Sequence, residues 1–264
     1  MKKYLVIGNP IEHSLSPKLH NYWIKQNNID AIYEKKKIDE NNIEELISEV
    51  RKESLNGINI TIPFKQSVIS FLDDLTDLAR KTQSVNTIFK KQNKIVGDNT
   101  DIFGFAMSIK NIKYSIQNKK VFILGAGGVV PSIIFALKNL GVSEIILSNR
   151  TKKKAENIKD LYPDLKILNW GEVTNFDIII NATSVGLKKD DKIELDLNSN
   201  NKDKLFYDVI YNPNMTSFLK EGKKLGNKIE NGKMMFIYQA QLAFKIWHNI
   251  LPKIDKETIN LLNT

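Results

Sequence analysis

A glycine-rich turn inside a strand–helix–strand pattern constrains this sequence more than any other feature. The continuous apolar run Val121–Leu124 is typical of a parallel strand that is buried on both faces. Gly125–Gly128 then makes a tight turn, and an apolar helical pattern follows over about Val129–Leu140. A second apolar strand is predicted at Ile145–Leu147. The pattern therefore predicts a βαβ unit within a parallel α/β sheet.

The composition of the turn is that of a phosphate-binding loop. Glycines let the backbone approach a pyrophosphate closely, and the following helix offers unpaired N–H groups and the positive end of its dipole. Val130 occupies the third small position of the usual fingerprint, and Pro131 follows, which a first helical turn tolerates. A glycine turn that only closes an αβ unit is the simpler alternative. We interpret the turn as a dinucleotide site formed by Gly125, Ala126, Gly127, Gly128 and Val129.

The end of the second strand indicates which dinucleotide binds. An NAD site usually carries an acidic residue there, which accepts hydrogen bonds from the adenosine ribose. This chain instead has Asn149, Arg150 and Thr151 followed by three lysines, and its first acid is Glu156. Arg150 and Lys154 are suited to hold a 2′-phosphate, the arginine through its planar fork. The sequence therefore favours NADP(H), although a solvated basic helix start is the simpler alternative.

Composition and charge exclude several classes of protein. The chain has 264 residues, 42% of them apolar, and no apolar run near membrane length. The absence of cysteine excludes disulfides and thiolate metal sites, and the three histidines lack metal-ligand spacing. The net charge of +9 comes from lysines scattered along the chain, without a nucleic-acid-binding signature. We expect a cytoplasmic globular enzyme that uses no metal and binds neither membrane nor nucleic acid.

The residues before the glycine-rich turn predict a second α/β region. Alternating strands and helices are expected at Lys3–Ile7, Pro17–Asn27, Ile32–Lys36, Asn42–Glu53 and Gly57–Ile62. Such alternation implies a mainly parallel sheet, whose ligands bind beyond the carboxyl ends of the strands. Ser14, Ser16, Thr61 and Lys65 all fall at that edge. The two serines are well placed to hydrogen-bond a carboxylate, although Ser16 is equally explained as a helix N-cap.

A helix and a hairpin are predicted next. The helix is expected over Asp73–Gln83, and the hairpin has a two-residue turn at Gln92-Asn93. The register of that hairpin brings Asn86 close to Asp101. A further helix is predicted to begin at about Thr100, and Asp101 in its first turn is also explained as a partner of the helix dipole.

The remainder of the chain continues the α/β pattern. Further elements are predicted at Lys152–Leu161, Leu165–Leu168, Asp177–Asn181, Leu205–Ile210, Thr216–Leu225, Lys228–Glu230, about 232–250 and Asp255–Leu262. The small-residue loop Asn181–Gly186, which contains Thr183, follows a strand at the edge where the nicotinamide end of a dinucleotide would lie. Gln239 lies on a helical face that can return to the N-terminal region.

These segments together resemble the shikimate dehydrogenase family over essentially the full length. The matching motifs are Gly8–Pro17, Asn59–Lys65, Val85–Thr87, Asn99–Asp101, Gly125–Gly128, Asn149–Thr151, Asn181–Gly186, Tyr207–Tyr211, Gly232, Met235 and Gln239-Ala240. So many ordered and spaced matches make chance implausible. Val130 and Pro131 depart from the usual small residues, and Val209 replaces a common methionine.

The resemblance implies two domains with a cleft between them. Residues 1–104, completed by residues 233–264, would form an α/β substrate-binding domain, and residues 105–232 a Rossmann-type NADP-binding domain. The implied reaction is the reversible NADPH-dependent reduction of 3-dehydroshikimate to shikimate in chorismate and aromatic amino acid biosynthesis. The catalytic pair would be Lys65 and Asp101.

The resemblance also assigns binding residues. Those expected at the substrate are Ser14, Ser16, Thr61, Lys65, Asn86, Asp101, Tyr211 and Gln239. Those expected at the cofactor are Gly125–Val129, Asn149, Arg150, Thr151, Lys154, Thr183, Val209, Gly232 and Asp77. Val209 and Gly232 would flank the nicotinamide.

Two alternatives remain at this stage. A relative that acts on quinate or uses NAD is disfavoured by the Ser14-x-Ser16 pair and by the basic residues after Ile145–Leu147. A non-catalytic ligand-binding relative is disfavoured by the intact pair Lys65 and Asp101. The sequence leaves open whether the protein is a monomer or a homodimer.

Overall fold

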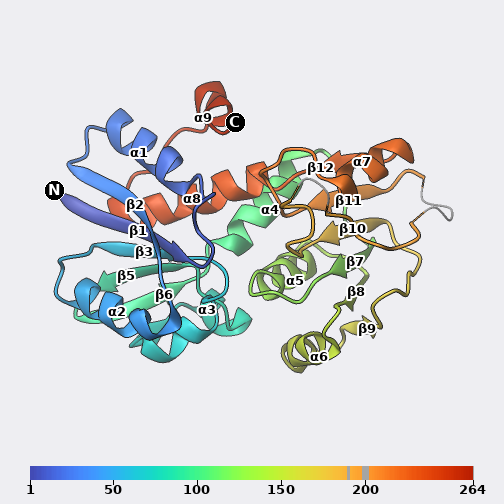
Figure 1. Cartoon of the computed structure of the whole chain (residues 1–264), viewed down its shortest axis with the longest axis horizontal. Helices are drawn as coiled ribbons and strands as arrows, with labels where there is room; N and C mark the ends of the chain where they lie inside the picture. Colours follow the sequence, from blue (N-terminus) through green and yellow to red (C-terminus); the bar gives the residue numbers. More distant parts are fainter. Residues whose placement is uncertain (189–190, 198–201, 264) are drawn as a thin grey trace. The chain divides into compact units, whose positions relative to one another are not determined.

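The chain divides into two compact units, each with its own six-stranded sheet (Figure 1). The computed structural model describes residues 1–188, 191–197 and 202–263. Unit 1 comprises Met1–Gly104 and Ile237–Thr264, and unit 2 comprises Phe105–Phe236. The boundaries between them fall within helices α4 (Asp101–Asn111) and α8 (Lys233–His248).

The sheet of unit 1 has the strand order β2-β1-β3-β5-β6-β4. Its strands are β1 (Lys2–Gly8), β2 (Ala31–Lys37), β3 (Gly57–Ile60), β4 (Asp74–Leu75), β5 (Thr87–Lys91) and β6 (Lys94–Asp98). Strand β1 pairs in parallel with β2 and β3, whereas β5 is antiparallel to both β3 and β6. The predicted hairpin register is confirmed, because Lys91 pairs with Lys94 across the turn.

Helices cover both faces of this sheet (Figure 1). They are α1 (Ser16–Gln26), η1 (Glu40–Asn42), α2 (Ile43–Arg51), η2 (Ser67–Phe71), α3 (Asp77–Thr82), α9 (Lys256–Leu261) and part of α8. Successive residues of a strand point to opposite faces. In β1, Ile7 joins the core formed with α2, whereas Tyr4 packs on Trp247 of α8 with ring centroids 4.9 Å apart.

The helix predicted over Asp73–Gln83 is wrong at its start. Asp74–Leu75 form strand β4, which pairs in parallel with β6, and helix α3 begins only at Asp77. Thr76 is the N-cap, and its hydroxyl accepts a hydrogen bond from the N–H of Ala79 at 3.4 Å. The preference of threonine for N-caps was the local signal that marked this start.

The sheet of unit 2 is parallel throughout the described pairings, in the order β12-β11-β10-β7-β8-β9. Its strands are β7 (Lys120–Leu124), β8 (Glu144–Ser148), β9 (Lys166–Leu168), β10 (Ile178–Asn181), β11 (Leu205–Asp208) and β12 (Lys228–Glu230). This is the doubly wound order, in which the chain progresses outward from β7 in one direction and from β10 in the other. A ligand crevice is expected beyond the carboxyl ends of β7 and β10, where that direction reverses.

The helices of unit 2 pack on both faces of its sheet. They are α5 (Val130–Asn139), α6 (Lys152–Leu161), α7 (Ser217–Lys224) and part of α4. In β11, Phe206 packs on Phe218 of α7, whereas the neighbouring Tyr207 packs on Phe105 of α4. The continuous apolar runs of the sequence thus become strands buried on both faces. In the described ranges, no helix combines the length and apolar character needed to cross a bilayer.

A fully buried histidine lies within an aromatic cluster of unit 1. His20 of α1 is 1% exposed and stacks on Tyr33 with ring centroids 4.1 Å apart. Neither of its ring nitrogens has a hydrogen-bond partner among the described residues. Burial lowers the pKa of His20 from 6.5 to about 3, and His248 contributes in the same direction. The folded protein therefore holds this imidazole in its neutral form.

His20 should make the protein less stable as the pH falls from about 6.5 toward 3. In this pH range His20 is protonated in the unfolded chain but stays neutral in the folded chain. The free energy of unfolding therefore decreases as the pH decreases. Urea unfolding at about pH 7 and about pH 5 gives the change in the free energy of unfolding between the two pH values. This free energy should fall by roughly 2 kcal/mol more in the wild type than in His20→Phe. The exposed His13, changed to Gln, is the matched control and should keep the wild-type pH dependence. Equal pH dependence in the wild type and His20→Phe would refute the role of this residue.

Candidate active site

An ion pair joins Lys65 and Asp101 in unit 1, although 36 positions separate them in the chain. Lys65 lies in the turn after β3, and Asp101 is the first residue of α4. Only 12% of the lysine side chain and 7% of the aspartate side chain are exposed. Asn86 donates from Nδ2 to the Oδ1 atom of Asp101 at 2.9 Å, while Oδ2 faces the ammonium. Both oxygens of this carboxylate are therefore held.

Asn86 is itself fixed through both ends of its side chain. Its Oδ1 atom accepts hydrogen bonds from the N–H of Thr100 at 2.8 Å and from the hydroxyl of Thr87 at 3.1 Å. Its Nδ2 atom also donates to Oε1 of Gln239 at 3.3 Å, which brings α8 to the same place. Asn86 directly precedes the hairpin, and α4 begins beside it. The carboxylate of Asp101 and the amide of Asn86 are therefore buried next to each other.

A second asparagine, Asn59, hydrogen-bonds to Asn86, which holds Asp101. Asn59 of β3 donates from Nδ2 to the main-chain oxygen of Asn86 and to the hydroxyl of Thr87, both at 3.0 Å. Its Oδ1 atom accepts from the hydroxyl of Tyr33 at 2.6 Å. The sequence alone indicated no role for Asn59. The signal was its place in the motif Asn59–Lys65, but the motif alone does not say which way the side chain points.

The predicted serine pair lies where the loop after β1 enters α1. The hydroxyl of Ser14 lies 3.3 Å from that of Ser16, and the N–H of Ser16 donates to Ser14 Oγ at 3.4 Å. Ser16 is not the N-cap, because α1 begins at Ser16 and the cap position is Leu15, which makes no side-chain cap bond. The alternative that Ser16 serves as the N-cap is therefore wrong.

Thr61 lies just beyond β3, next to the end of β1. Its N–H donates to the main-chain oxygen of Ile7 at 3.0 Å, and its methyl group faces Gly8 so closely that a Cβ there would lie 2.5 Å away. Its hydroxyl makes no hydrogen bond to the residues that the structure describes. Asp77 is exposed in the first turn of α3 in the same unit.

The glycine-rich turn of unit 2 lies beyond the carboxyl end of β7. Gly125 has φ +107°, and a Cβ there would lie 2.8 Å from the main-chain oxygen of Ala182. Only glycine therefore fits between the turn and the loop after β10. Gly127 is exposed, and a Cβ there would meet nothing within 4 Å. The backbone at Gly127 is thus open to a ligand.

Val209 and Gly232 lie against each other in unit 2. A Cβ on Gly232 would lie 2.0 Å from the main-chain oxygen of Val209. The N–H of Gly232 donates to the main-chain oxygen of Ile210 at 3.1 Å. The N–H of Val209 in turn donates to the oxygen of Asn181 at 2.9 Å, next to Thr183. Tyr211 stacks on Phe236 with ring centroids 4.3 Å apart.

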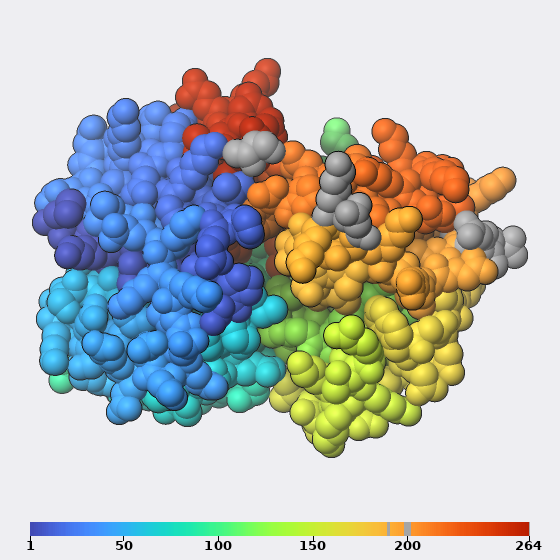
Figure 2. Space-filling view, viewed as in Figure 1, coloured from blue at the N-terminus to red at the C-terminus, as the bar shows by residue number. Residues whose placement is uncertain are grey.

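The basic residues after β8 carry unpaired charge. Arg150 and Lys154 are exposed, and neither forms an ion pair with the described residues (the segment with α6 is yellow-green in Figure 2). Asn149 donates from Nδ2 to the oxygen of Thr151 at 2.8 Å, which shapes the turn into α6. Thr151 is the N-cap of α6 but makes no side-chain cap bond. Cations without carboxylate partners favour an anionic ligand.

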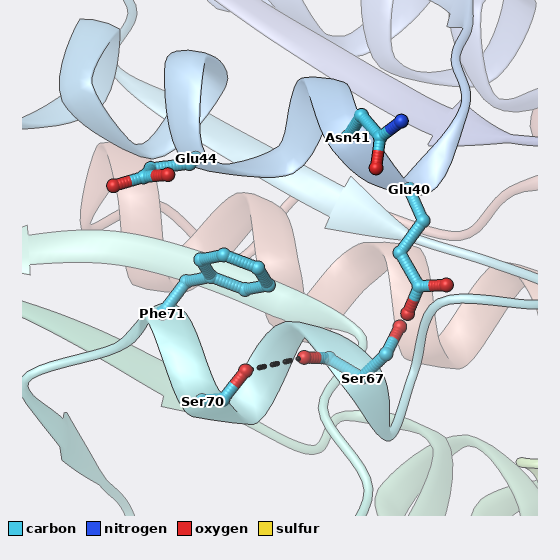
Figure 3. A pocket seen from close by; sticks show the side chains of 6 residues that line it. All are labelled: Glu40, Asn41, Glu44, Ser67, Ser70 and Phe71. Carbon is cyan, nitrogen blue, oxygen red and sulfur yellow. Dashed lines mark hydrogen bonds between the residues drawn. The ribbon is translucent and has the colours of Figure 1, made fainter.

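A separate pocket of about 420 Å³ lies elsewhere in unit 1. Figure 3 shows Glu40, Asn41 and Glu44 on one wall, and Ser67, Ser70 and Phe71 of η2 on the other. None of the predicted site residues lines it. We therefore do not assign it to the candidate active site.

Two glycine substitutions should separate ligand approach from packing. Gly127→Ala should leave the fold intact, because a Cβ meets nothing there, but should weaken NADP(H) binding by ~10-fold if a phosphate approaches that backbone. Gly232→Ala should lower the free energy of unfolding by about 1–3 kcal/mol, because its Cβ collides with a backbone oxygen. Calorimetry with NADP⁺ and urea unfolding of both variants provide the comparison. A Gly127→Ala variant that binds NADP⁺ as well as the wild type would contradict the assignment.

Two families of known proteins match the chain. Residues 6–88 match the shikimate dehydrogenase substrate binding domain, and residues 107–221 match shikimate / quinate 5-dehydrogenase. The shikimate dehydrogenase (NADP(+)) of Pelagibacter ubique strain HTCC1062 is 58% identical over 262 residues, which cover 99% of each chain. The chain belongs to the shikimate dehydrogenase family.

Solved structures of the family share the whole fold. Shikimate dehydrogenase from Aquifex aeolicus is 33% identical, with a TM-score of 0.90 and coverage of 100% of this chain and 97% of that chain. The enzyme from Thermus thermophilus, solved in complex with NADP(H) and shikimate, is 28% identical with a TM-score of 0.90, and the match covers 100% and 99% of the two chains. The expected two-domain α/β fold of shikimate dehydrogenases is confirmed.

Proposed function

We propose that this chain catalyses the reversible NADPH-dependent reduction of 3-dehydroshikimate to shikimate, a step of chorismate and aromatic amino acid biosynthesis. The observation that carries the proposal is the largely buried pair of Lys65 and Asp101, whose carboxylate is also held by Asn86. A buried ammonium fixed by a carboxylate suits the reduction of a carbonyl group. Membership in the shikimate dehydrogenase family supports the choice of substrate.

Lys65 acts as the general acid in the proposed mechanism. Reduction of a ketone places negative charge on the carbonyl oxygen, which requires a nearby cation and a proton. The Lys65 ammonium supplies both, and in the reverse direction its neutral amine accepts the proton from the substrate hydroxyl. Asp101 orients the ammonium and accepts a hydrogen bond from a substrate hydroxyl. NADPH, when bound, supplies the hydride for the carbonyl carbon.

The other polar residues of unit 1 bind the substrate in this proposal. Ser14 and Ser16 hold the carboxylate, since the Ser16 hydroxyl is not used as a helix cap. Thr61, Asn86 and Gln239 hold the hydroxyl groups, together with Tyr211 of unit 2. Residues 1–104 with 233–264 accordingly form the substrate-binding domain, and residues 105–232 form the NADP-binding domain.

Apart from Asp77, the cofactor residues belong to unit 2 in this proposal. The turn Gly125–Val129 holds the pyrophosphate, for which the open backbone at Gly127 is suited. Asn149, Arg150, Thr151 and Lys154 hold the 2′-phosphate, for which the unpaired cations are suited. Val209 and Gly232 flank the nicotinamide, with Thr183 beside them. Asp77, which is exposed in the first turn of α3 in unit 1, is assigned a cofactor contact from the family resemblance alone.

One absorbance assay tests the proposed reaction. The purified chain, supplied with shikimate and NADP⁺, should form NADPH, and it should do so more efficiently than with quinate or with NAD⁺. Preference for quinate or NAD⁺ would favour the alternative paralogue. The absence of turnover with all four combinations would favour a ligand-binding relative. We also propose that the enzyme is cytoplasmic. It is a monomer or a homodimer, and light scattering distinguishes these two states.

A further inference from the structure

A buried carboxylate at the end of β11 takes no part in the mechanism above. Asp208 is 0% exposed and accepts three hydrogen bonds. Its Oδ1 atom accepts from the N–H of Ile210 at 3.0 Å and from Nδ2 of Asn181 at 3.1 Å. Its Oδ2 atom accepts from the hydroxyl of Thr216 at 2.6 Å. Two connections of unit 2, the loop after β10 and the loop after β11, therefore meet at one carboxylate.

The asparagine partner shapes the loop after β10. Oδ1 of Asn181 accepts hydrogen bonds from the N–H and the hydroxyl of Thr183 at 3.1 and 2.7 Å. Its Nδ2 atom also donates to the main-chain oxygen of Val185 at 3.0 Å. The Thr183 hydroxyl accepts from the N–H of Val185 at 3.0 Å, which closes the turn. The conformation of this loop thus depends on a side chain that Asp208 holds.

The other partners shape the loop after β11. The bond to Ile210 fixes the backbone just after Val209, whose oxygen lies against Gly232. Thr216 caps α7, because its hydroxyl accepts from the N–H of Leu219 at 3.3 Å while it donates to Asp208. The segment from Val209 to the start of α7 is thus held at both of its ends.

We propose that Asp208 is a positioning residue for the nicotinamide end of the cofactor. It does not touch the cofactor but clamps together the two loops that carry Thr183, Val209 and, by contact, Gly232. This inference rests on the proposed function, which assigns those three residues to the nicotinamide. It adds a residue for which the sequence alone indicated no role.

The chemistry of a carboxylate explains why this position holds an aspartate. Two oxygens with several lone pairs accept three donors at once, and the negative charge strengthens each bond. Burial raises the pKa of Asp208 to about 6, and the three hydrogen bonds only partly offset that effect. At about pH 8 the group is therefore ionised, and assays at that pH report on the intact clamp. Asparagine retains an acceptor for the donors at Oδ1 and can donate to Thr216, so it should preserve part of the clamp.

The test compares two ligands that share one end. NADP⁺ reaches the nicotinamide loops, whereas 2′,5′-ADP ends at the adenosine and its phosphates. Asp208→Ala should lower kcat for shikimate oxidation by ~10-fold or more, because misplacement of a reacting group is costly. It should weaken binding of NADP⁺ but leave binding of 2′,5′-ADP unchanged within error. Asp208→Asn should recover part of kcat, and it replaces the alanine variant if that variant does not fold.

A matched control removes another buried hydrogen bond from the same strand. The Ser108 hydroxyl lies 2.8 Å from that of Tyr207, the neighbour of Asp208 on β11, and both are buried. Ser108→Ala should lower stability without changing kcat or the affinity for either ligand. The inference is overturned if Asp208→Ala keeps the kcat of the control, or if affinity for 2′,5′-ADP falls in parallel with that for NADP⁺.

Failure of the proposed function would look different. In that case the wild type itself would not oxidise shikimate, while the comparison of NADP⁺ with 2′,5′-ADP in the wild type and Asp208→Ala would still test the clamp. The inference would be overturned if the wild type bound NADP⁺ no more tightly than 2′,5′-ADP and both Asp208 variants did the same.

Discussion

Replacing Lys65 with alanine should lower kcat for shikimate oxidation by ~100-fold or more, the scale expected for loss of a general acid–base group. The substitution removes both the cation beside the carbonyl oxygen and the proton that is transferred to it. Because the ammonium also neutralises Asp101 in a largely buried place, the variant leaves a carboxylate there without its ion-pair partner. Steady-state kinetics with shikimate and NADP⁺, together with calorimetry for shikimate, separate the loss of chemistry from the loss of binding.

Two further lysine variants sharpen this experiment. Lys65→Arg keeps a cation but offers no group that readily gives up a proton, so its kcat should stay far below that of the wild type. Lys90 also belongs to unit 1 and forms an ion pair with Glu53. Because neither residue is assigned to the candidate active site, Lys90→Ala should keep normal kinetics. A kcat near normal in Lys65→Ala would remove this residue from the mechanism.

Removing the charges of Arg150 and Lys154 together should abolish the preference for NADPH. The double variant Arg150→Ala, Lys154→Ala should raise KM for NADPH by ~100-fold, because each charge-assisted hydrogen bond to the bound phosphate contributes about 1.5 kcal/mol. KM for NADH should change little, since NADH has no 2′-phosphate. Steady-state kinetics with both cofactors at low salt measure the two effects directly.

A lysine on the same helix serves as the control for net charge. Lys159 is exposed in the last turn of α6, away from the turn that follows β8. Lys159→Ala changes the charge of the same element and should leave KM for NADPH unchanged. If KM for NADPH stayed normal in the double variant, or rose equally for both cofactors, the 2′-phosphate would bind elsewhere.

Local patterns in the sequence predicted most secondary-structure elements. Helix α6 and strand β12 have the bounds that the sequence predicted, because amphipathic periodicity and apolar alternation are local properties. The hairpin turn at Gln92-Asn93 also fixed a register, which brought Asn86 within 2.9 Å of Asp101. Strand β4 was missed because two residues are too few to show a period, and its pairing with β6 is a tertiary contact.

The candidate site was predictable only in part. Family motifs identified Lys65, Asp101 and the glycine-rich turn, since chemistry of that kind requires particular residue types at particular spacings. The same motifs contained Asn59 and Asp208 but did not reveal their roles. Each of these side chains bonds to groups on other strands or loops, such as Tyr33 for Asn59 and Thr216 for Asp208. Such partners are set by the packing of segments that the sequence lists far apart.

The sequence by itself determined most of the strands and helices along the chain, the phosphate-binding turn and the excess of positive charge after the second strand of that βαβ unit. Only the tertiary structure decided that Lys65 meets Asp101, that Ser16 is not a cap, and that one buried carboxylate ties two loops together. The physical reason is range. Backbone propensity and periodicity act between neighbours along the chain, whereas ion pairs and buried hydrogen bonds form only after the sheets have brought distant residues within about 3 Å of one another.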